Sequence, residues 1–485
     1  MNLKDELWFD PALCFIGGRW VRPAGGERLE LENPSSGTPL CAIARGTAED
    51  IDAAVAAAGD AMDGIWGRMT APERGRILAR LGALVLDRTE DLARLEAADV
   101  GKPLKQARAD AIALARYMEF YGGAADKIHG ATIPYLDGYT VYSLREPHGV
   151  TGHIVPWNYP MQIIGRSVGA ALAMGNAAVL KPAEEACLTA LAFAALAEEA
   201  GLPAGALNVV PGLGEEAGAA LSAHKGVHHI SFTGSVAVGS LIQTAAARNI
   251  VPVTLELGGK SPQLVFDDAD LDAALPFLVN AGIQNAGQTC SAASRILVQR
   301  GIYDRVVENM AARYAALRVG PALADLDVGP LISARQKQLV SGFLAKGDDL
   351  EQVAKGRIAG DAPAHGHYVA PTLFAGAAPD HVLAQSEIFG PVQIIIPFDD
   401  EAEAVAIANG TEYGLVASLW TRDGARQMRA AKALHSGQVF INNYGAGGGV
   451  ELPFGGVGKS GHGREKGFEA LYGFSRLKTV AAFHG

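Results

Sequence analysis

The stretch Val150-Thr151-Gly152-His153-Ile154-Val155 is a short apolar run, and a helical pattern over Pro160–Ala173 follows it. The same alternation continues to residue 256. Its further apolar runs are Ala177–Leu180, Leu207–Val210, His229–Phe232 and Val251–Leu255, and its further helical patterns are Leu188–Ala200, Glu215–Leu221 and Val236–Ala247. Such alternation predicts an α/β fold with a doubly wound parallel sheet. That architecture is typical of nucleotide-binding domains, but it fixes no function by itself.

A second alternating pattern occupies residues 260–455. Its candidate strands include Gln263–Phe266, Ile296–Val298, Val392–Pro397, Ala417–Trp420 and Gln438–Ile441. Beyond it, the apolar run Leu477–Phe483 has no evident partner strand, and residues 131–146 read as a hairpin that turns at Asp137-Gly138. We therefore expect these two segments to pair across a subunit interface.

The first 130 residues are predicted to be mainly helical. After short strands over residues 15–45, Thr47-Ala48-Glu49-Asp50 has the pattern of a capping box that opens a helix. Further helical patterns cover Pro72–Val85, Glu90–Asp99 and Lys105–Tyr121.

Length and charge limit the classes of function. A chain of 485 residues corresponds to roughly three domains. The net charge of −11 argues against nucleic acid or an anionic membrane as a partner. We expect the basic cluster Arg422–Lys432 to be a solvated helix face. The acidic start, Met1–Glu6, has no apolar signal core, and the longest apolar run, 168–180, is too short to span a bilayer. A cytoplasmic location is therefore expected.

Metal and disulfide chemistry are not predicted. The four cysteines, Cys14, Cys41, Cys187 and Cys290, are far apart and form no C-x-x-C pair, which disfavours disulfides and structural zinc. His224, His228 and His229 lie close together, but no carboxylate or cysteine completes a zinc set.

One cysteine has unusual neighbours. Cys290 lies in Gln284-Asn285-Ala286-Gly287-Gln288-Thr289-Cys290-Ser291-Ala292, a small and polar turn, whereas a core cysteine usually has bulky apolar neighbours. Small residues leave room for a ligand to reach the sulfur. Only a few per cent of a free thiol is ionised at neutral pH, so a nucleophilic Cys290 needs help from its surroundings.

Two apparent phosphate motifs carry little weight. Gly212-Leu213-Gly214-Glu215-Glu216-Ala217 imitates a dinucleotide fingerprint after a strand, but its paired glutamates suit a pyrophosphate poorly, and a plain strand-to-helix turn remains the alternative. Gly259-Lys260-Ser261 and Gly458-Lys459-Ser460 resemble the end of a P-loop. The required earlier glycine is replaced by Thr254 and Pro453 respectively, so a kinase-like site is not predicted.

Three strand ends carry polar groups. Phe232-Thr233-Gly234-Ser235 turns from a strand into a helix, with serine at the anion-binding end. Val155-Pro156-Trp157-Asn158-Tyr159-Pro160 also opens a helix, and Asn158 alone could be a turn or cap residue. Glu256-Leu257-Gly258-Gly259-Lys260 ends an apolar strand, and Glu256 alone could be a solvated strand-end charge.

Together these motifs resemble the NAD(P)-dependent aldehyde dehydrogenase superfamily, in its hydrolytic, non-acylating branch. The matching motifs follow the family's order and spacing over nearly the whole chain: Pro156–Pro160, Lys181-Pro182-Ala183-Glu184, Phe232–Ser235, Glu256–Lys260, Gly287–Cys290, Glu387-Ile388-Phe389-Gly390-Pro391 and Pro453-Phe454-Gly455-Gly456.

The resemblance implies three structural parts. A Rossmann-type coenzyme domain would comprise residues 1–126, 147–259 and 460–472, and an α/β catalytic domain residues 260–459. A small β oligomerisation arm would comprise residues 127–146 and 473–485, which implies a homodimer or a homotetramer.

It also implies a chemistry. Cys290 would attack an aldehyde carbon, and the Asn158 amide with the Cys290 N–H would hold the oxyanion. No side chain accepts hydride, so a nicotinamide is required. Glu256 would activate the water that hydrolyses the thioester. Relatives that transfer the acyl group to coenzyme A lack this glutamate. A non-catalytic structural protein, as in some lenses, would not need Cys290, Asn158 and Glu256 together.

Cofactor residues follow from the same resemblance. Lys181 and Glu184 would bind the adenosine ribose, Ser235 the pyrophosphate, and Glu387 and Phe389 the nicotinamide ribose and ring. Glu184 would repel a 2′-phosphate, so NAD is expected in preference to NADP. The other expected cofactor residues are Val155, Pro156, Trp157, Gly214, Phe232, Thr233, Gly234 and Leu257.

The expected substrate pocket departs from the family pattern. Arg166, eight residues after Asn158, resembles members that oxidise carboxylated semialdehydes or aromatic aldehydes, and Ser167 replaces the family's usual lysine. Gln284 stands where short semialdehyde enzymes often have a second arginine. The glycine-rich loop 445–449 lacks the usual aromatic wall, although a plain surface loop is the alternative. We expect a bulky or aromatic aldehyde, with Arg166 meeting any anionic group. The pocket residues are Tyr159, Arg166, Gln284, Thr289, Ser291, Gly448 and Phe454.

Overall fold

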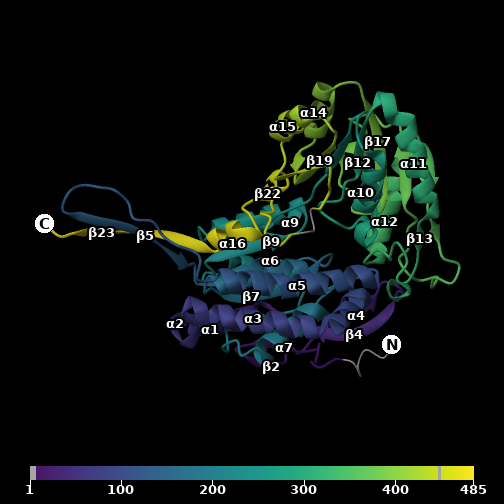
Figure 1. Ribbon diagram of the computed structural model, residues 1–485. Coiled ribbons are helices and arrows are strands. Elements are labelled where there is room, and N and C mark those ends of the chain that lie inside the picture. Colours follow the sequence, from purple (N-terminus) through teal and green to yellow (C-terminus); the bar gives the residue numbers. More distant parts are fainter. Residues whose placement is uncertain (1–6, 446–448) are drawn as a thin grey trace.

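The computed structural model describes residues 7–445 and 449–485. Two sheets organise it, one in the lower and one in the upper part of Figure 1. The α/β fold class with parallel sheets is confirmed. The first sheet has the order β2 (Arg19–Val21), β1 (Cys14–Ile16), β8 (Leu207–Val209), β7 (Ala177–Pro182), β6 (Val150–Val155), β9 (His229–Thr233), β10 (Val253–Glu256) and β22 (Gly461–His462).

The middle of this first sheet is parallel, from β8 through β7, β6 and β9 to β10, as the alternating pattern predicts. Strands with buried side chains on both faces need helices to cover them. Helices α1 and α6 both contact β7, and α3 and α6 both contact α5. The helices associated with this half are α1 (Ala48–Asp63), α2 (Ile65–Arg68), α3 (Ala71–Asp87), α4 (Thr89–Asp99), α5 (Leu104–Ala124), α6 (Pro160–Ala173), α7 (Leu188–Glu199), α8 (Ala219–Ala223) and α9 (Val236–Ala247).

Two local predictions in this half have different outcomes. The capping box at the start of α1 is confirmed, because Thr47 N donates to Asp50 Oδ2 at 2.8 Å. The helix expected over Glu215–Leu221 instead begins as a π-turn, Gly214–Gly218, and continues as α8. Ahead of α1, β3 (Arg28–Asn33) and β4 (Thr38–Ala44) form an antiparallel pair.

The second sheet has a hydrophobic core of its own. It is parallel except for the edge strand β14, and its order is β14 (Glu351–Lys355), β16 (Thr372–Ala375), β17 (Val392–Phe398), β12 (Arg295–Gln299), β11 (Pro262–Val265), β19 (Val416–Trp420) and β20 (Gln438–Ile441). Its helices are α10 (Leu271–Ile283), α11 (Tyr303–Ala316), α12 (Ala334–Leu344), α13 (Val382–Gln385), α14 (Glu401–Asn409) and α15 (Gly424–Ala433). Two short pairs, β13 (Arg318–Val319) with β15 (Arg357–Ile358) and β18 (Tyr413–Gly414) with β21 (Val457–Gly458), complete the strands.

The C-terminal strand has a partner within its own chain. After α16 (Gly467–Gly473), β23 (Ser475–Phe483) pairs antiparallel with β5 (Tyr139–Pro147) along its whole length. Figure 1 shows this ribbon extending away from the rest of the molecule. The expectation that the C-terminal strand lacks a partner within the chain is therefore wrong. Each strand of this two-stranded ribbon keeps one edge beyond the pair, so pairing across a subunit interface stays a prediction. The expected hairpin over 131–146 is reduced to one bridge between Thr132 and Tyr142.

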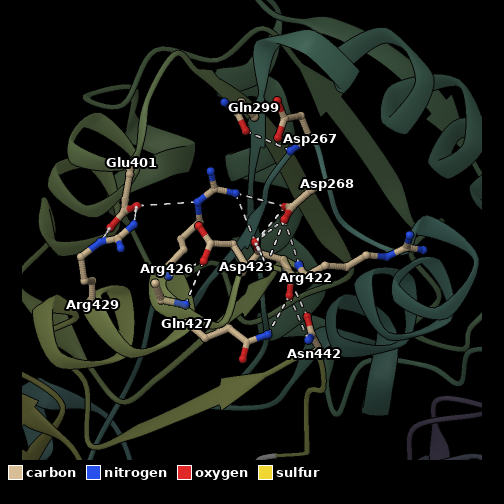
Figure 2. A network of polar contacts seen from close by, with 12 residues as sticks. Asp267, Asp268, Gln299, Glu401, Arg422, Asp423, Arg426, Gln427, Arg429 and Asn442 are labelled. Carbon is tan, nitrogen blue, oxygen red and sulfur yellow. Dashed lines mark hydrogen bonds and ion pairs between the residues drawn. The ribbon is translucent and has the colours of Figure 1, made fainter.

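The basic cluster on α15 is not simply a solvated face. Asp268, just after β11, accepts a hydrogen bond from Thr421 Oγ1 at 2.8 Å. It also accepts one from Arg426 Nη1 at 3.1 Å, as Figure 2 shows. Arg426 also lies over the Phe266 ring at 4.4 Å, and only 21% of its side chain is exposed. Its neighbour Arg429 is 57% exposed and pairs with Glu401. The expected solvated face is therefore confirmed at Arg429 and wrong at Arg426. The contacts of Arg426 tie α15 to the end of β11.

Candidate active site

A cavity of about 580 Å³ brings most of the predicted catalytic and pocket residues together. Its walls come from α5, α6, the end of α10 and the segment that follows α10. Cys290 and Asn158 line it with six of the seven predicted pocket residues, Tyr159, Arg166, Gln284, Thr289, Ser291 and Phe454. The seventh, Gly448, lies outside the described residues.

The nucleophile turn is held in a strained backbone conformation. Asn285 and Ala286, just after α10, have φ values of 48° and 55°. Left-handed residues with a side chain cost on the order of 1–3 kcal/mol each, so surrounding contacts must maintain them. Asn285 N donates to Gln106 Oε1 at 2.9 Å, and Asn285 Nδ2 donates to the Asn158 carbonyl at 2.9 Å. These bonds tie the turn that carries Cys290 to α5 and to the segment that follows β6.

Asn158 points its amide toward the same turn. Its Nδ2 donates to the Gln288 carbonyl at 3.0 Å, and its side chain is buried. An amide nitrogen carries two N–H donors, so one remains for another acceptor. Among the described residues, Asn158 Oδ1 has no hydrogen-bond partner.

Tyr159 is supported by a buried charge cluster that the sequence did not reveal. Its hydroxyl is 3.0 Å from Thr289 Oγ1, and Lys102 Nζ lies 3.8 Å from its ring centroid. Lys102 forms ion pairs with Glu96, at 2.6 Å, and with Asp110. Burial acts to lower the pKa of Lys102, but the two carboxylates outweigh it and raise that pKa. The two carboxylates therefore favour the charged form of Lys102 behind the pocket wall.

Cys290 lines the cavity and is partly exposed. Burial raises the pKa of Cys290 to about 11, while Arg166 acts to lower it. Glu256, the last residue of β10, is buried, and neither carboxylate oxygen has a hydrogen-bond partner among the described residues. Burial raises the pKa of Glu256 too, and Arg166 again opposes the shift. Arg166 thus favours the ionised forms of both groups.

Arg166 is not the free anion receptor that the sequence predicted. Arg166 Nε forms an ion pair with Glu465 Oε2, and Nη2 donates to Thr233 Oγ1 at 3.2 Å. Glu465 Oε1 also accepts from Ser231 Oγ at 2.6 Å. The charge of Arg166 is therefore already balanced by Glu465. Neither periodicity nor a short motif could have identified this partner, because the two residues are far apart in the sequence.

The expected cofactor residues lie mainly at the carboxyl ends of the first sheet's strands. Lys181, the second-to-last residue of β7, pairs with Glu184 at 2.8 Å. Ser235 caps α9 by accepting a hydrogen bond from Val238 N at 3.3 Å. Val155 is the last residue of β6, and Pro156 and Trp157 follow it. Phe232 and Thr233 are the last residues of β9, and Gly234 follows them. Leu257 directly follows β10. Gly214 opens the π-turn before α8.

The expected nicotinamide end is built from the second half of the chain. Glu387 accepts a hydrogen bond from Gly259 N at 3.0 Å, and burial raises the pKa of Glu387 to about 7. A Cβ at Gly258 would lie 2.1 Å from Glu387 Oε2, so only glycine fits beside that carboxylate. The rings of Trp157 and Phe389 meet edge to face, with centroids 5.4 Å apart. A helix N-terminus, an ion pair and aromatic walls are groups that fit a dinucleotide.

The cavity also has an aromatic residue that no sequence motif indicated. Tyr444, directly before the glycine-rich loop, lines the cavity and donates its hydroxyl hydrogen to the Ser291 carbonyl. Gly445 and Gly449 line the cavity as well, while residues 446–448 lie outside the described part. The expected lack of an aromatic wall is therefore corrected at Tyr444.

Comparison with known proteins identifies the class. Residues 20–480 match the model of the aldehyde dehydrogenase family. The crystal structure of a protein from Burkholderia cenocepacia, described as an aldehyde dehydrogenase, superimposes with a TM-score of 0.97. Its sequence is 65% identical to this one, and the match covers 98% of this chain and 100% of that chain. The NAD⁺ complex of an aldehyde dehydrogenase from Bacillus cereus is 38% identical, with a TM-score of 0.95 and coverage of 98% and 97%. Aldehyde dehydrogenase family 2 member B4 of Arabidopsis thaliana is 43% identical over 470 residues, covering 96% of this chain and 87% of the relative.

The chain belongs to the aldehyde dehydrogenase family. It is accordingly an enzyme that oxidises aldehydes with a nicotinamide cofactor. In the described ranges, no helix is both long and apolar enough to cross a membrane. The same ranges contain no cluster of histidine, cysteine and carboxylate side chains suited to a metal ion.

Proposed function

We propose that the protein oxidises a bulky or aromatic aldehyde to a carboxylic acid, with Cys290 as nucleophile, Asn158 as oxyanion donor and Glu256 as general base. One observation carries this proposal. The partly exposed Cys290 thiol and the Asn158 amide line one cavity, and the buried Glu256 carboxylate, which has no hydrogen-bond partner among the described residues, is near enough for its charge to act on the Cys290 thiol.

The attack step uses the groups around the sulfur. Cys290 adds to the aldehyde carbon, and the carbonyl oxygen becomes an oxyanion that accepts hydrogen bonds from the second Asn158 amide N–H and from Cys290 N–H. Such donors stabilise the transition state because they are already oriented. Arg166 favours the thiolate by lowering the pKa of Cys290 against the effect of burial. A nicotinamide held by the proposed cofactor residues would accept a hydride from that carbon, which leaves the acyl group on Cys290 as a thioester.

The hydrolysis step uses Glu256. A water molecule that attacks the thioester must lose a proton, and Glu256 is the proposed acceptor because its oxygens are not bonded to other described groups. Gly455 gives this carboxylate space: its φ is 152°, and a Cβ there would lie 2.8 Å from Glu256 Oε1. The carboxylic acid then leaves Cys290.

We infer that NAD is preferred over NADP. The Lys181–Glu184 pair supports this inference, because Glu184 accepts hydrogen bonds from a ribose hydroxyl and repels a 2′-phosphate. The proposed cofactor set is the one expected from the sequence, from Val155 at the end of β6 to Glu387 and Phe389.

We further propose the division into a coenzyme domain, a catalytic domain and an arm, and an assembly of two or four subunits. The ribbon of β5 and β23 supports the assembly, because it exposes large apolar side chains to solvent. Their exposed fractions are 38% for Tyr139, 41% for Leu144, 58% for Leu477 and 69% for Phe483. Apolar groups in such number on an arm are typical of a contact surface.

A panel of aldehydes tests the proposed activity. NADH formation is measured with propanal, benzaldehyde and a succinate-type semialdehyde, each with and without coenzyme A. The proposal predicts the highest kcat/KM with benzaldehyde and no effect of coenzyme A. A preference for propanal would contradict the proposed substrate class, a need for coenzyme A would indicate an acylating enzyme, and no turnover would favour a non-catalytic protein.

A further inference from the structure

One tyrosine of the cavity wall keeps its hydroxyl free of the rest of the described chain. Tyr117, on α5, is only 1% exposed, and it lines the cavity. Two further tyrosines of this wall bind the nucleophile turn. The Tyr159 hydroxyl is 3.0 Å from Thr289 Oγ1. Tyr444 donates to the Ser291 carbonyl. The Tyr117 hydroxyl, in contrast, has no hydrogen-bond partner among the described residues.

The Tyr117 ring is held in place from two sides. A Cβ at Gly165 of α6 would lie 2.6 Å from the ring atom Cδ2 of Tyr117, so the α6 backbone packs directly against the ring. The ring also stacks on Tyr121, with centroids 6.1 Å apart and an interplanar angle of 16°. The Tyr117 oxygen is not one of the fully enclosed polar atoms that lack a partner. The small accessible area of this side chain therefore includes its oxygen, which opens to the cavity.

The free hydroxyl is a neutral hydrogen-bonding group. Burial raises the pKa of Tyr117, so its phenol stays protonated at neutral pH. A phenol hydroxyl can donate one hydrogen bond and can also accept. When a tyrosine is buried, its hydroxyl usually has such a partner. The space beside this hydroxyl is the cavity that Cys290 lines, so a polar group of the substrate fits as the partner.

The charges around Tyr117 favour an uncharged partner. Each charged group that acts on Tyr117 is already paired within the protein. The pairs are Arg166 with Glu465, Asp110 with Lys102, and Glu451 with Arg116. The Glu256 carboxylate acts on both Cys290 and Lys466 in the same cavity. An anionic substituent would therefore meet a like charge in Glu256, and a cationic substituent would meet one in Arg166, whereas a hydroxyl would meet neither penalty.

We propose that the Tyr117 hydroxyl is a specificity determinant that hydrogen-bonds an uncharged, hydroxyl-bearing substituent on the ring of an aromatic aldehyde. The walls formed by Tyr159, Tyr444 and Phe454 suit the ring itself. This inference rests on the proposed function and narrows its substrate class. Tyr117 is a binding residue in this proposal and takes no part in bond formation.

A comparison of substrates on the wild-type enzyme tests the proposal without any mutation. The three isomers of (hydroxymethyl)benzaldehyde are each compared with the ethylbenzaldehyde of the same substitution, because the two members of a pair differ only by a hydroxyl in place of a methyl group. With saturating NAD, kcat/KM of at least one alcohol should exceed that of its ethyl partner by about two- to tenfold, the effect of one net hydrogen bond. Equal or lower efficiency of all three alcohols would overturn the proposal.

Variants then assign the preference to one hydroxyl. In Tyr117→Phe the ratio of alcohol to ethyl efficiency should fall to one or below. Tyr121→Phe is the matched control, since Tyr121 is buried on the same helix, stacks on Tyr117 and donates its hydroxyl hydrogen to the Arg166 carbonyl at 3.4 Å. The ratio should not change in this control. An unchanged ratio in Tyr117→Phe would overturn the proposal.

Two further outcomes separate this proposal from the proposed function. An equal loss of efficiency with the alcohol and the ethyl compound in Tyr117→Phe would show that the hydroxyl serves the reaction or the fold, and it would reject the specificity role alone. Wild-type enzyme that oxidises neither benzaldehyde nor any ethylbenzaldehyde would reject the proposed function, and this inference with it.

Discussion

The ammonium of Lys102 lies 3.8 Å from the centre of the Tyr159 ring, whose hydroxyl is 3.0 Å from Thr289 Oγ1. A buried cation is thus connected, through one aromatic side chain, to the residue next to the nucleophile. Lys102 is itself held by Glu96 and Asp110. Substitutions can therefore distinguish two effects. The Tyr159 hydroxyl orients the nucleophile turn, and the Lys102 ion pairs stabilise the buried cluster.

Tyr159→Phe removes the hydroxyl and keeps the ring over Lys102. One hydrogen bond contributes about 0.5–1.5 kcal/mol, so kcat should fall by roughly two- to tenfold with little change in Tm. Lys102→Met leaves Glu96 and Asp110 without their cation and should destabilise the protein by about 3–5 kcal/mol. Thermal unfolding and steady-state kinetics of both variants check this. A large fall of Tm in Tyr159→Phe would show that the hydroxyl serves folding instead.

Asn158→Ala tests the oxyanion donor. Loss of one oriented donor typically lowers kcat by about 10²–10³-fold. The variant also loses its bond to the Gln288 carbonyl, so Gln284→Ala, at another wall of the same cavity, serves as a comparison for general disturbance of the pocket. Activity of Asn158→Ala within tenfold of the wild type would contradict the assigned role.

Buried histidines predict a loss of stability in mild acid. Burial lowers the pKa of His153 to about 3, and its ring stacks on Phe474 at 5.5 Å. Below about pH 6.5 this histidine binds a proton in the unfolded chain but not in the folded protein. The free energy of unfolding is therefore unaffected by this group above pH 6.5, and it falls as the pH drops from 6.5 toward 3. At pH 5 the loss from His153 alone is about 2 kcal/mol.

Chemical unfolding at pH 7.5 and pH 5 measures this effect. The free energy of unfolding should differ less between pH 7.5 and pH 5 in His153→Gln than in the wild type. In His435→Gln, which changes an exposed histidine, this difference should match that of the wild type. An equal pH difference in all three proteins would show that His153 is not the cause.

Glu184→Ala tests the cofactor preference. The wild type should use NAD with a much higher kcat/KM than NADP, and the variant should narrow that ratio because the repelling carboxylate is gone. The matched change Glu216→Ala affects a glutamate that pairs with Arg45 and should leave the ratio unaltered. Equal efficiency of the wild type with both cofactors would show that Glu184 does not contact the ribose.

The sequence predicted the elements that local patterns encode. Most parallel strands of both sheets follow from alternating apolar runs, although β16 was not among the predicted strands. The turn at Cys290 follows from its small polar neighbours. Contacts between distant residues have no local periodicity, so the partner of β23, the Arg166–Glu465 pair and the Lys102 cluster could not be predicted.

The most direct test of the central claim is rapid mixing of Glu256→Gln with NAD and benzaldehyde. The claim is that Cys290 carries the acyl group until Glu256 activates a water molecule. The variant should release one fast burst of NADH per active site and then almost stop, because the thioester forms but is not hydrolysed. Steady turnover at the wild-type rate would contradict the role of Glu256, and absence of the burst would contradict a thioester on Cys290.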